Sequence, residues 1–313
     1  MKNVIYRLLL NLIFLGSLLC SFENFAQQEQ LYITYPMMPL NVNPAYAGSR
    51  EVVSMAALYR RRPLFSTVGA AATNQQYFNF DMPIAQDKMA IGFQAYSADQ
   101  LIGNNTGGII GNLGLYGDFA YRFTLPNDGK LAVGVQVGVT QVPAYISSTG
   151  GGIGTTGFNS SIGLGLYYHN DDYYAGISLL NLNANKNEFN QPSFITAGYV
   201  FDIDDDLQLK TGILVRRLSN NYTTRTDVDL NATAWINKRF GLGVWYQNTG
   251  SEFSNNAFLG SLQIQFSKIQ LGYAYDFTGN SNGAVGAKEG FHQIMLRYEF
   301  DSGNGKSGVF RYF

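Results

Sequence analysis

The chain has 313 residues, with 21 basic and 22 acidic side chains and a formal net charge of −1, so it offers nucleic acid no cationic surface. Only 14% of its residues are charged, 14% are aromatic and 35 are glycines, whereas soluble domains carry about 25% charged residues. A chain this poor in charge, with no long apolar run after its first residues, favours an outer-membrane β-barrel over a soluble β-sandwich or lectin-like protein.

The first residues read as a secretory leader. Lys2 and Arg7 lie around the start of an apolar run, and Ala26 stands where a leader would be cut, so residues 1–26 are predicted to be a signal peptide. The run is shorter than the roughly 20 residues of a transmembrane helix. The only cysteine, Cys20, lies inside this leader. We therefore expect the mature protein to have no disulfide and no cysteine-ligated metal.

Residues 27–50 follow the leader and contain the stretch LNVNPAYAGSR. Its proline disfavours helix and its glycine permits a tight turn. We expect an ordered, plug-like segment that enters the periplasmic mouth of the barrel, with Tyr46 anchored among inward-facing side chains. Two roles stay open: a brace that completes the barrel, and a closure or docking edge for a partner. The residues assigned to this partner or plug role are Asn43, Pro44, Ala45, Tyr46, Ala47 and Gly48.

In the rest of the chain, apolar residues alternate with small or polar ones, which is the period of a β-strand. In KLAVGVQVGVTQV, every odd-numbered position from Leu131 to Val139 is apolar and every even-numbered position from Ala132 to Thr140 is small or polar. The segments are long enough for tilted strands to cross a bilayer. The sequence predicts an all-β fold, a fourteen-stranded antiparallel transmembrane barrel of the outer-membrane type, with strands near residues 51–60, 73–82, 88–97, 109–125, 130–145, 158–168, 173–182, 192–202, 206–218, 225–236, 239–249, 256–266, 268–278 and 290–300.

Short turns alternate with longer loops between these strands. The short turns are PIAQD, PNDG, HNDD, DIDD, NKR and the Ser267–Lys268 junction, and the longer loops include SADQLIGNNTGG, ISSTGGGIGTTG, SNNYTTR and TGNSNGAVGAKE. Outer-membrane barrels place tight turns at the periplasmic end and long loops at the extracellular end. We therefore expect a multi-pass barrel over residues 51–301, both termini in the periplasm, and a periplasmic tail over residues 302–313.

Charged side chains lie on the predicted inward faces of two neighbouring strands. Lys210 and Arg216 share a face of one strand, and Asp227 and Asp229 share a face of the next. Pairing across the loop between them brings Arg216 opposite Asp227. We expect these four side chains to brace the lumen, and a substrate-binding role is the less favoured alternative. Inward glycines are expected to leave room for the plug-like segment: Gly134, Gly138, Gly165 and Gly272.

Patterns for catalysis or metal binding are absent from the sequence. Its only histidines are His169 and His292, which excludes a histidine-rich metal site. His169 lies in the HNDD turn, where we expect it to be solvated, and His292 shares a strand face with apolar residues, which predicts an interfacial position. The one G-x-S-x-G pattern, GNSNG at 279–283, lies in a predicted loop and not at the strand-to-helix turn of a serine hydrolase. We therefore expect a protein that is not an enzyme and has no cofactor.

Five stretches together resemble the PorP/SprF family of outer-membrane proteins, which are associated with the type IX secretion system of the Bacteroidetes. They are NPAYAG at 43–48, LYR at 58–60, GLGLYYHNDDYYAGISLLNL from Gly163, LGYAYD at 271–276 and HQIMLRYEF at 292–300. They span nearly all of the mature chain. The family often shows Gln-Trp shortly after the Tyr-Arg of the first strand, whereas this chain reads YRRRP, so its first loop departs from the pattern.

The resemblance implies a non-enzymatic helper in the export or surface attachment of partner proteins. The partners it implies are a secreted surface adhesin used in gliding, or its C-terminal domain, the periplasmic ring of the secretion system, and outer-membrane lipid. We expect extracellular loops to hold the adhesin, while the plug-like segment and the tail residues Arg311, Tyr312 and Phe313 face the secretion apparatus. A passive pore or a channel for hydrophobic solutes is the principal alternative, and a barrel lipase is the third.

Overall fold

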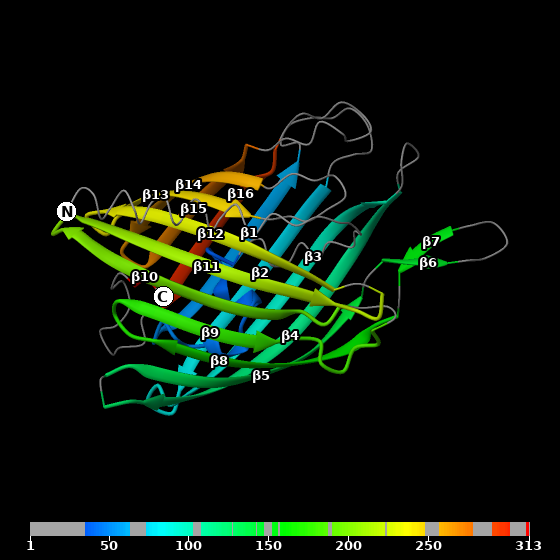
Figure 1. The fold of residues 1–313 in the computed structure, drawn as a ribbon, viewed down its shortest axis with the longest axis horizontal. Helices are drawn as coiled ribbons and strands as arrows, with labels where there is room; N and C mark the ends of the chain where they lie inside the picture. The colour runs from blue at the N-terminus through cyan, green and yellow to red at the C-terminus, as the bar shows by residue number, and fades with distance from the viewer. Residues whose placement is uncertain are drawn as a thin grey trace, which may run out of the picture.

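The protein is a closed antiparallel β-barrel, seen in a computed structural model (Figure 1). The structure describes residues 35–62, 73–102, 108–126, 128–141, 143–146, 152–155, 157–186, 190–222, 224–247, 257–277, 290–300 and 311–312. The predicted signal peptide and residues 27–34 of the plug-like segment lie outside these residues. No helix in the described part of the chain is long and apolar enough to cross a membrane.

Fourteen strands form the barrel wall, which confirms the predicted fold and strand number. The wall strands are β1 (Val53–Arg62), β2 (Thr73–Ile84), β3 (Met89–Ile102), β4 (Gly108–Thr124), β5 (Lys130–Gln141), β8 (Asn159–His169), β9 (Tyr173–Leu179), β10 (Ser193–Asp204), β11 (Leu207–Ser219), β12 (Thr224–Ile236), β13 (Phe240–Gln247), β14 (Ala257–Phe266), β15 (Ile269–Asp276) and β16 (His292–Phe300). Each strand pairs with its neighbours along the chain, as a meander does.

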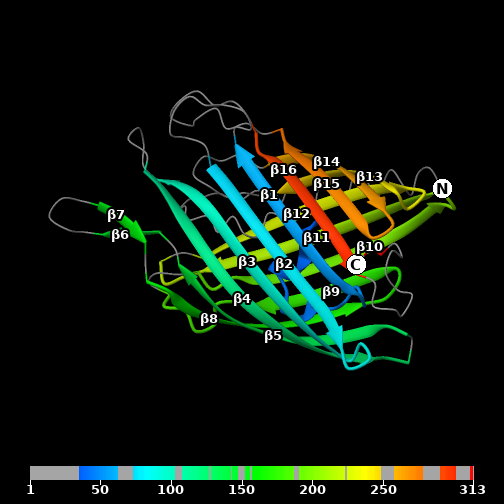
Figure 2. The same cartoon turned by 180° about the vertical axis from the view of Figure 1, so that it is seen from behind.

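The barrel closes where the first wall strand meets the last. β1 pairs antiparallel with β16, from Val53 opposite Phe300 to Arg61 opposite His292. These two strands lie side by side in Figure 2. Closure leaves no sheet edge unpaired, which is the condition for a sheet to lie in a bilayer.

Side chains alternate between the lipid-facing surface and the lumen, as the sequence predicts. On β5, Val135 is 41% exposed on the outer surface, whereas Gln136 is 3% exposed and points inward. β15 repeats the pattern, with Leu271 and Tyr273 outside and Gln270 inside. The outer face is therefore apolar and the lumen is lined by polar and small side chains.

The two ends of the barrel differ in their connections. The connection between β10 and β11 and the connection between β14 and β15 contain only two residues each, 205–206 and 267–268, and both lie at the end where β1 starts and β16 finishes. We call this the turn end, and the opposite end the loop end. Strands and connections alternate between these ends as predicted.

Two of the predicted long loops are shorter than expected. β3 extends to Ile102 and β4 begins at Gly108, so the predicted loop SADQLIGNNTGG is mostly strand and only 103–107 separates the two. Likewise, 220–223 alone separates β11 from β12. A strand that extends beyond the bilayer needs no apolar face, so its polar sequence resembles a loop.

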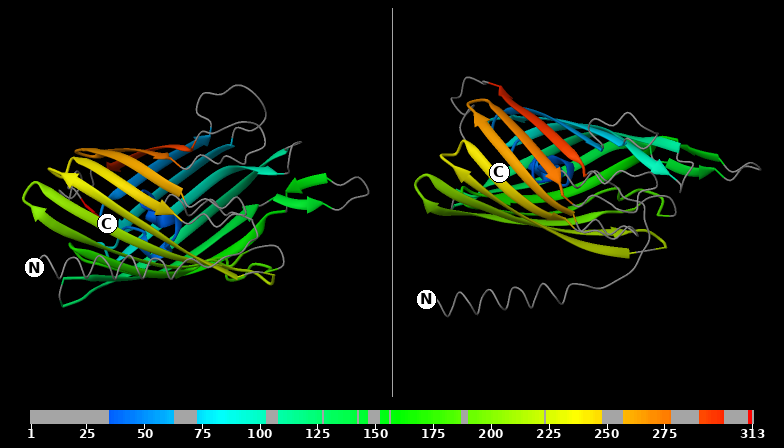
Figure 3. Two further views of the ribbon diagram at one scale, coloured as in Figure 1. Left: turned by 45° about the horizontal axis from the view of Figure 1, so that its top comes forward. Right: turned by 90° about the horizontal axis from the view of Figure 1, so that it is seen from above.

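The predicted strand 130–145 is wrong at its end. β5 stops at Gln141, and β6 (Pro143–Ile146) leaves the wall to pair with β7 (Gly152–Thr155) in a separate two-stranded sheet. This hairpin projects beyond the loop end of the barrel (Figure 3). The alternation of apolar residues on β5 ends at Val139, because Gln141 interrupts it, and the predicted strand runs past this break.

A charge on the outer surface tests the membrane-facing assignment. We expect Val135→Arg to lower the stability of the folded barrel by about 2 to 4 kcal/mol, because a cation near the bilayer midplane loses its hydration. Urea titration of folding into lipid vesicles measures this change. Tyr222→Arg is the control, since Tyr222 is 75% exposed in the connection between β11 and β12. Equal tolerance of both substitutions would contradict a lipid-facing Val135.

Candidate functional site

Residues 35–50, which we call the plug, lie inside the barrel, where Figure 1 shows them as the blue segment. The plug forms two short 3-10 helices, η2 (Pro39–Asn41) and η3 (Pro44–Tyr46). The Asn43 side chain caps η3, because its Oδ1 accepts a hydrogen bond from the Ala45 amide at 3.0 Å. The same side chain donates through Nδ2 to the Leu166 carbonyl on β8 at 2.8 Å. Asn43 therefore starts the helix and fastens it to the wall.

The plug's main chain is held by barrel side chains. Outside helix or sheet, a buried carbonyl needs a donor from elsewhere. Four plug carbonyls find one on a different strand each: Met37 accepts from Arg297 Nη2 at 2.6 Å, Leu40 from Gln94 Nε2 at 3.0 Å, Ala47 from Arg122 Nη2 at 2.9 Å, and Val42 from the Ser178 hydroxyl. The donors come from β16, β3, β4 and β9, so the plug is fixed on several sides of the lumen.

Apolar side chains of the plug pack into three clusters along the lumen. Tyr46 is 3% exposed, and its ring meets that of Tyr167 edge to face with 5.4 Å between centroids. The plug members of the clusters are Met37 and Met38 in the first, Leu40, Ala45, Tyr46 and Ala47 in the second, and Tyr35 and Val42 in the third. The structure thus places Asn43 to Gly48 in an ordered, buried, non-strand segment.

Glycines of the wall leave room for the plug. A Cβ on Gly134 would overlap the main chain of Ala45, and a Cβ on Gly165 would overlap the Asn43 side chain. A Cβ on Gly272 would lie 3.1 Å from the Met37 methyl group. The predicted role of inward glycines holds for these three positions. Gly138 differs, because its neighbour is Tyr116 of the adjacent strand and not the plug.

Gly48 turns the chain at the turn-end side of the plug. Its φ of +68° lies in the left-handed region, which favours glycine. A Cβ here would overlap the Ala90 methyl group, so the position requires glycine for space as well. The Gly48 amide donates to Asp81 Oδ1 at 3.1 Å. The glycine of NPAYAG is therefore explained by both backbone conformation and packing.

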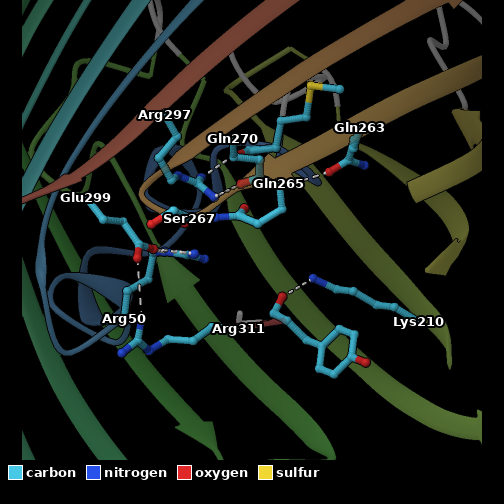
Figure 4. Close-up of polar contacts among 11 residues, drawn as sticks. Arg50, Lys210, Gln263, Gln265, Ser267, Gln270, Arg297, Glu299 and Arg311 are labelled. Carbon is cyan, nitrogen blue, oxygen red and sulfur yellow. Dashed lines mark hydrogen bonds and ion pairs between the residues drawn. The ribbon is translucent and has the colours of Figure 1, made fainter. Parts of the chain in front are cut away.

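A buried ion pair attaches the C-terminal end of the plug to the barrel wall. Arg50 donates to Glu299 Oε1 through Nε at 2.9 Å and Nη2 at 2.6 Å, and both side chains are at most 5% exposed. Arg311 approaches the other oxygen of Glu299 at 3.4 Å. Figure 4 shows Arg50, Glu299 and Arg311 together. Breaking such a buried pair by removing one partner typically costs about 3 to 5 kcal/mol. Next along the chain, Glu51 pairs with Lys130 of β5.

The described residues of the tail lie at the barrel mouth instead of extending away from it. Arg311 contacts Glu299 of β16, and the Tyr312 carbonyl accepts a hydrogen bond from Lys210 Nζ of β11 (Figure 4). Both tail residues are partly buried. Phe313 lies outside the described residues. The sequence had assigned residues 302–313 to a tail facing the periplasm, and its inward contacts were not foreseen.

The predicted lumen brace divides into two parts. Arg216 pairs with Asp227 in register, and its guanidinium lies 3.3 Å from Asp227 and 3.6 Å from Asp229. Lys210 contacts Tyr312 and not this group. Arg216 lies six positions after Lys210 on the same strand, which is about 20 Å at the usual strand rise. A shared face on one strand therefore did not bring the four residues into one cluster.

The two histidines have different surroundings. His169 is 9% exposed at the end of β8, with its ring 5.6 Å from that of Tyr167, so the expectation of a solvated side chain is wrong. β8 continues one residue into the HNDD turn, which turns the ring inward. His292 lies on the outer face, where its Nδ1 hydrogen bonds the Tyr273 hydroxyl at 2.8 Å, as an interfacial position predicts.

Several residues that hold the plug were not identified from the sequence, namely Arg50, Gln94, Arg122, Ser178, Arg297 and Glu299. A signal was present, because the five on strands occupy inward positions between apolar outward neighbours. Arg297 and Glu299, for example, alternate with Leu296, Tyr298 and Phe300. No group of three or more side chains suited to a metal ion occurs within the described ranges.

The chain matches the family described as type IX secretion system membrane protein PorP/SprF over residues 24–298. No curated protein matches it. Among solved structures, a Pseudomonas aeruginosa FadL homologue is 13% identical, with 85% of this chain and 94% of that chain covered and a TM-score of 0.47. Acinetobacter baumannii outer membrane protein Omp33 is 9% identical, with 79% and 96% covered and a TM-score of 0.44. A Rh. blastica porin mutant is 10% identical, with 80% and 98% covered and a TM-score of 0.36.

A single added methyl group tests the fit of plug and wall. We expect Gly134→Ala to lower the stability of the barrel by about 1 to 3 kcal/mol, because the new Cβ meets the Ala45 main chain, which cannot rotate away. Gly117→Ala is the matched control, since the nearest atom to its added Cβ is 3.9 Å away. Thermal unfolding followed by the shift between folded and unfolded bands on a gel measures both. An equal effect of the two would contradict the tight fit.

Deletion of the plug tests whether it fills the lumen. We expect the protein lacking residues 35–47 to conduct ions in planar bilayers, and the intact protein to conduct much less, because the plug packs against strands on several sides of the lumen. The folded band on a gel confirms that the deletion variant still forms a barrel. Equal conductance of the two proteins would show that the plug does not restrict passage.

Proposed function

Because this chain belongs to the PorP/SprF family of type IX secretion system membrane proteins, we propose that it helps export a partner surface protein or anchor it at the cell surface. The family match over residues 24–298 carries the proposal, since it covers every barrel strand except the last two residues of β16. The chain is an outer-membrane β-barrel of this secretion system. Its partner is a secreted protein such as a gliding adhesin, or that protein's C-terminal domain.

The plugged lumen supports a scaffold role. Sixteen residues of the chain itself, 35–50, occupy the interior and are fixed by hydrogen bonds from several strands. A barrel filled in this way presents fixed surfaces at its two ends. Binding of a large protein partner at those surfaces needs no open lumen.

The turn end faces the periplasm in this proposal. The N-terminal start of β1, the end of β16 and the described tail residues all lie there, and tight turns mark the periplasmic end of outer-membrane barrels. The plug residues Asn43 to Gly48 and the tail then lie on the side of the periplasmic ring components. The lipid-facing band contacts outer-membrane lipid.

The loop end faces the outside and holds the partner. The β6–β7 hairpin is a separate two-stranded sheet that projects beyond the loop end of the barrel (Figure 3), and it forms part of the proposed docking surface. Loops carried on a rigid scaffold are common places for binding. The predicted loop TGNSNGAVGAKE belongs to the same end, and residues 278–289 lie outside the described part of the chain.

Two deletions test this arrangement. We expect removal of residues 143–156, and separately of 278–289, to release the surface protein from cells into the medium, because each removes part of the proposed docking surface. Immunoblots of cells and medium measure the distribution. The folded gel band of the variant barrel in outer-membrane fractions is the control for assembly. Unchanged retention after both deletions, with the barrel folded, would exclude the loop end as the docking surface.

A further inference from the structure

A cavity remains between the plug and the wall at the turn end. It has a volume of about 60 Å³, enough for a few water molecules or a carboxylate group. Four cationic side chains line it, and they come from four different parts of the chain: Arg50 from the plug, Lys210 from β11, Arg297 from β16 and Arg311 from the tail. Figure 4 shows these four residues around one space. We call this cavity the cationic pocket.

The charged side chains that line the cationic pocket are all positive, and the carboxylates of Asp81 and Glu299 lie outside the lining, close to its arginines. Among the described residues, neither aspartate nor glutamate lines it. Glu299 binds Arg50 and Arg311 from outside the lining. Arg297 donates to the Gln270 side chain at 2.8 Å and to the Met37 carbonyl at 2.6 Å, both of which are neutral acceptors. Cations gathered in a poorly solvated site attract an anion more strongly than they do in water.

Aromatic rings form much of the remaining lining. Trp235 and Tyr46 line the pocket and are 4% and 3% exposed, and Tyr167 and Tyr174 lie beside them. Because these rings are buried, they keep water away from the space beside the cations.

The tail shows how a peptide can bind at this place. Its Tyr312 carbonyl accepts a hydrogen bond from Lys210, and its Arg311 pairs with Glu299, so two consecutive peptide residues are held at the rim by wall side chains. Both residues are only partly buried, which leaves the rim accessible from the turn end. A second peptide that displaces the tail can use the same donors.

We propose that the cationic pocket binds the carboxylate of a side chain from a partner protein's peptide, while the rest of that peptide lies at the rim beside the tail. The carboxylate lies among Arg50, Lys210 and Arg297, and the peptide enters from the turn end. The proposed function supplies only the source of the peptide, a protein of the secretion system or its cargo. The chemistry of recognition rests on the pocket itself.

Tryptophan fluorescence reports on binding directly. The chain has two tryptophans, Trp235 and Trp245, and only Trp235 lines the pocket. In a Trp245→Phe background, the purified full-length protein in detergent is titrated with a synthetic peptide of alternating phenylalanine and glutamate, blocked at both ends. The matched probe carries glutamine in place of glutamate. We expect the glutamate peptide to change the emission saturably and the glutamine peptide to bind at least about tenfold more weakly, as the loss of a charge-assisted hydrogen bond predicts.

Two substitutions locate the site. We expect Lys210→Gln to weaken binding of the glutamate peptide about tenfold, and Lys186→Gln, on an exposed connection, to leave it unchanged. Thermal unfolding confirms that both variants are folded. Equal affinity for the two peptides, or an unchanged affinity in Lys210→Gln, overturns the proposal. Inorganic phosphate that competes as well as the peptide also overturns it, because the site is then selective only for small anions.

Failure of this experiment is distinguishable from failure of the proposed function. The titration uses a synthetic peptide and purified protein, so it does not depend on secretion. The loop deletions measure retention of a surface protein at the opposite end of the barrel. Either result can therefore stand without the other.

Discussion

The structure depends on one constraint: an irregular segment inside a barrel must find hydrogen-bond partners for its own main chain. A buried peptide group without a partner costs free energy comparable to a lost hydrogen bond. Backbone hydrogen bonds within the plug form two short 3-10 helices and further turns, but none of these bonds uses the carbonyls of Met37, Leu40, Val42 or Ala47. Its free carbonyls are therefore met by side chains of the wall, among them the guanidinium groups of Arg122 and Arg297. Polar residues inside the barrel are placed by this need as much as by contact with water.

Space imposes the complementary condition. Inward positions that do not donate to the plug must often be small. Gly134 adjoins the Ala45 main chain, and Gly165 adjoins the Asn43 side chain, so closely that no side chain fits. The inner face of the wall thus carries both hydrogen-bond donors and glycines. The donors meet carbonyls of residues 35–50 and the glycines leave space for them, so both fit one conformation of the plug. A porin-like lumen lined only by solvated polar groups would need neither feature. The interior is better described as a packed core that happens to be polar, with the plug as one of its layers.

Much of the fold could be predicted from the sequence, because each barrel strand shows a period of two within a short stretch of residues. The alternation on β5 and β15 is predicted from a period of two alone. The pairing of Arg216 with Asp227 is predicted once two such strands are joined by a short connection. Contacts between distant parts of the chain were not accessible in this way. Arg297 meets Met37 across 260 positions, and Lys210 meets Tyr312 across 102. Nothing near Lys210 in sequence distinguishes a partner on the adjacent strand from one on the tail. The β6–β7 hairpin was missed because the predicted strand continues to residue 145, past the break in alternation at Gln141.

The position of the seam has a consequence for biogenesis. The plug precedes β1 directly, and β1 pairs with β16, which is the last strand to be synthesised. β16 also carries Arg297 and Glu299, the two side chains that hold Met37 and Arg50 of the plug. Until β16 arrives, β1 has an unpaired edge and the plug lacks its bonds to Arg297 and Glu299. Closure of the wall and completion of the plug's contacts therefore occur in the same step.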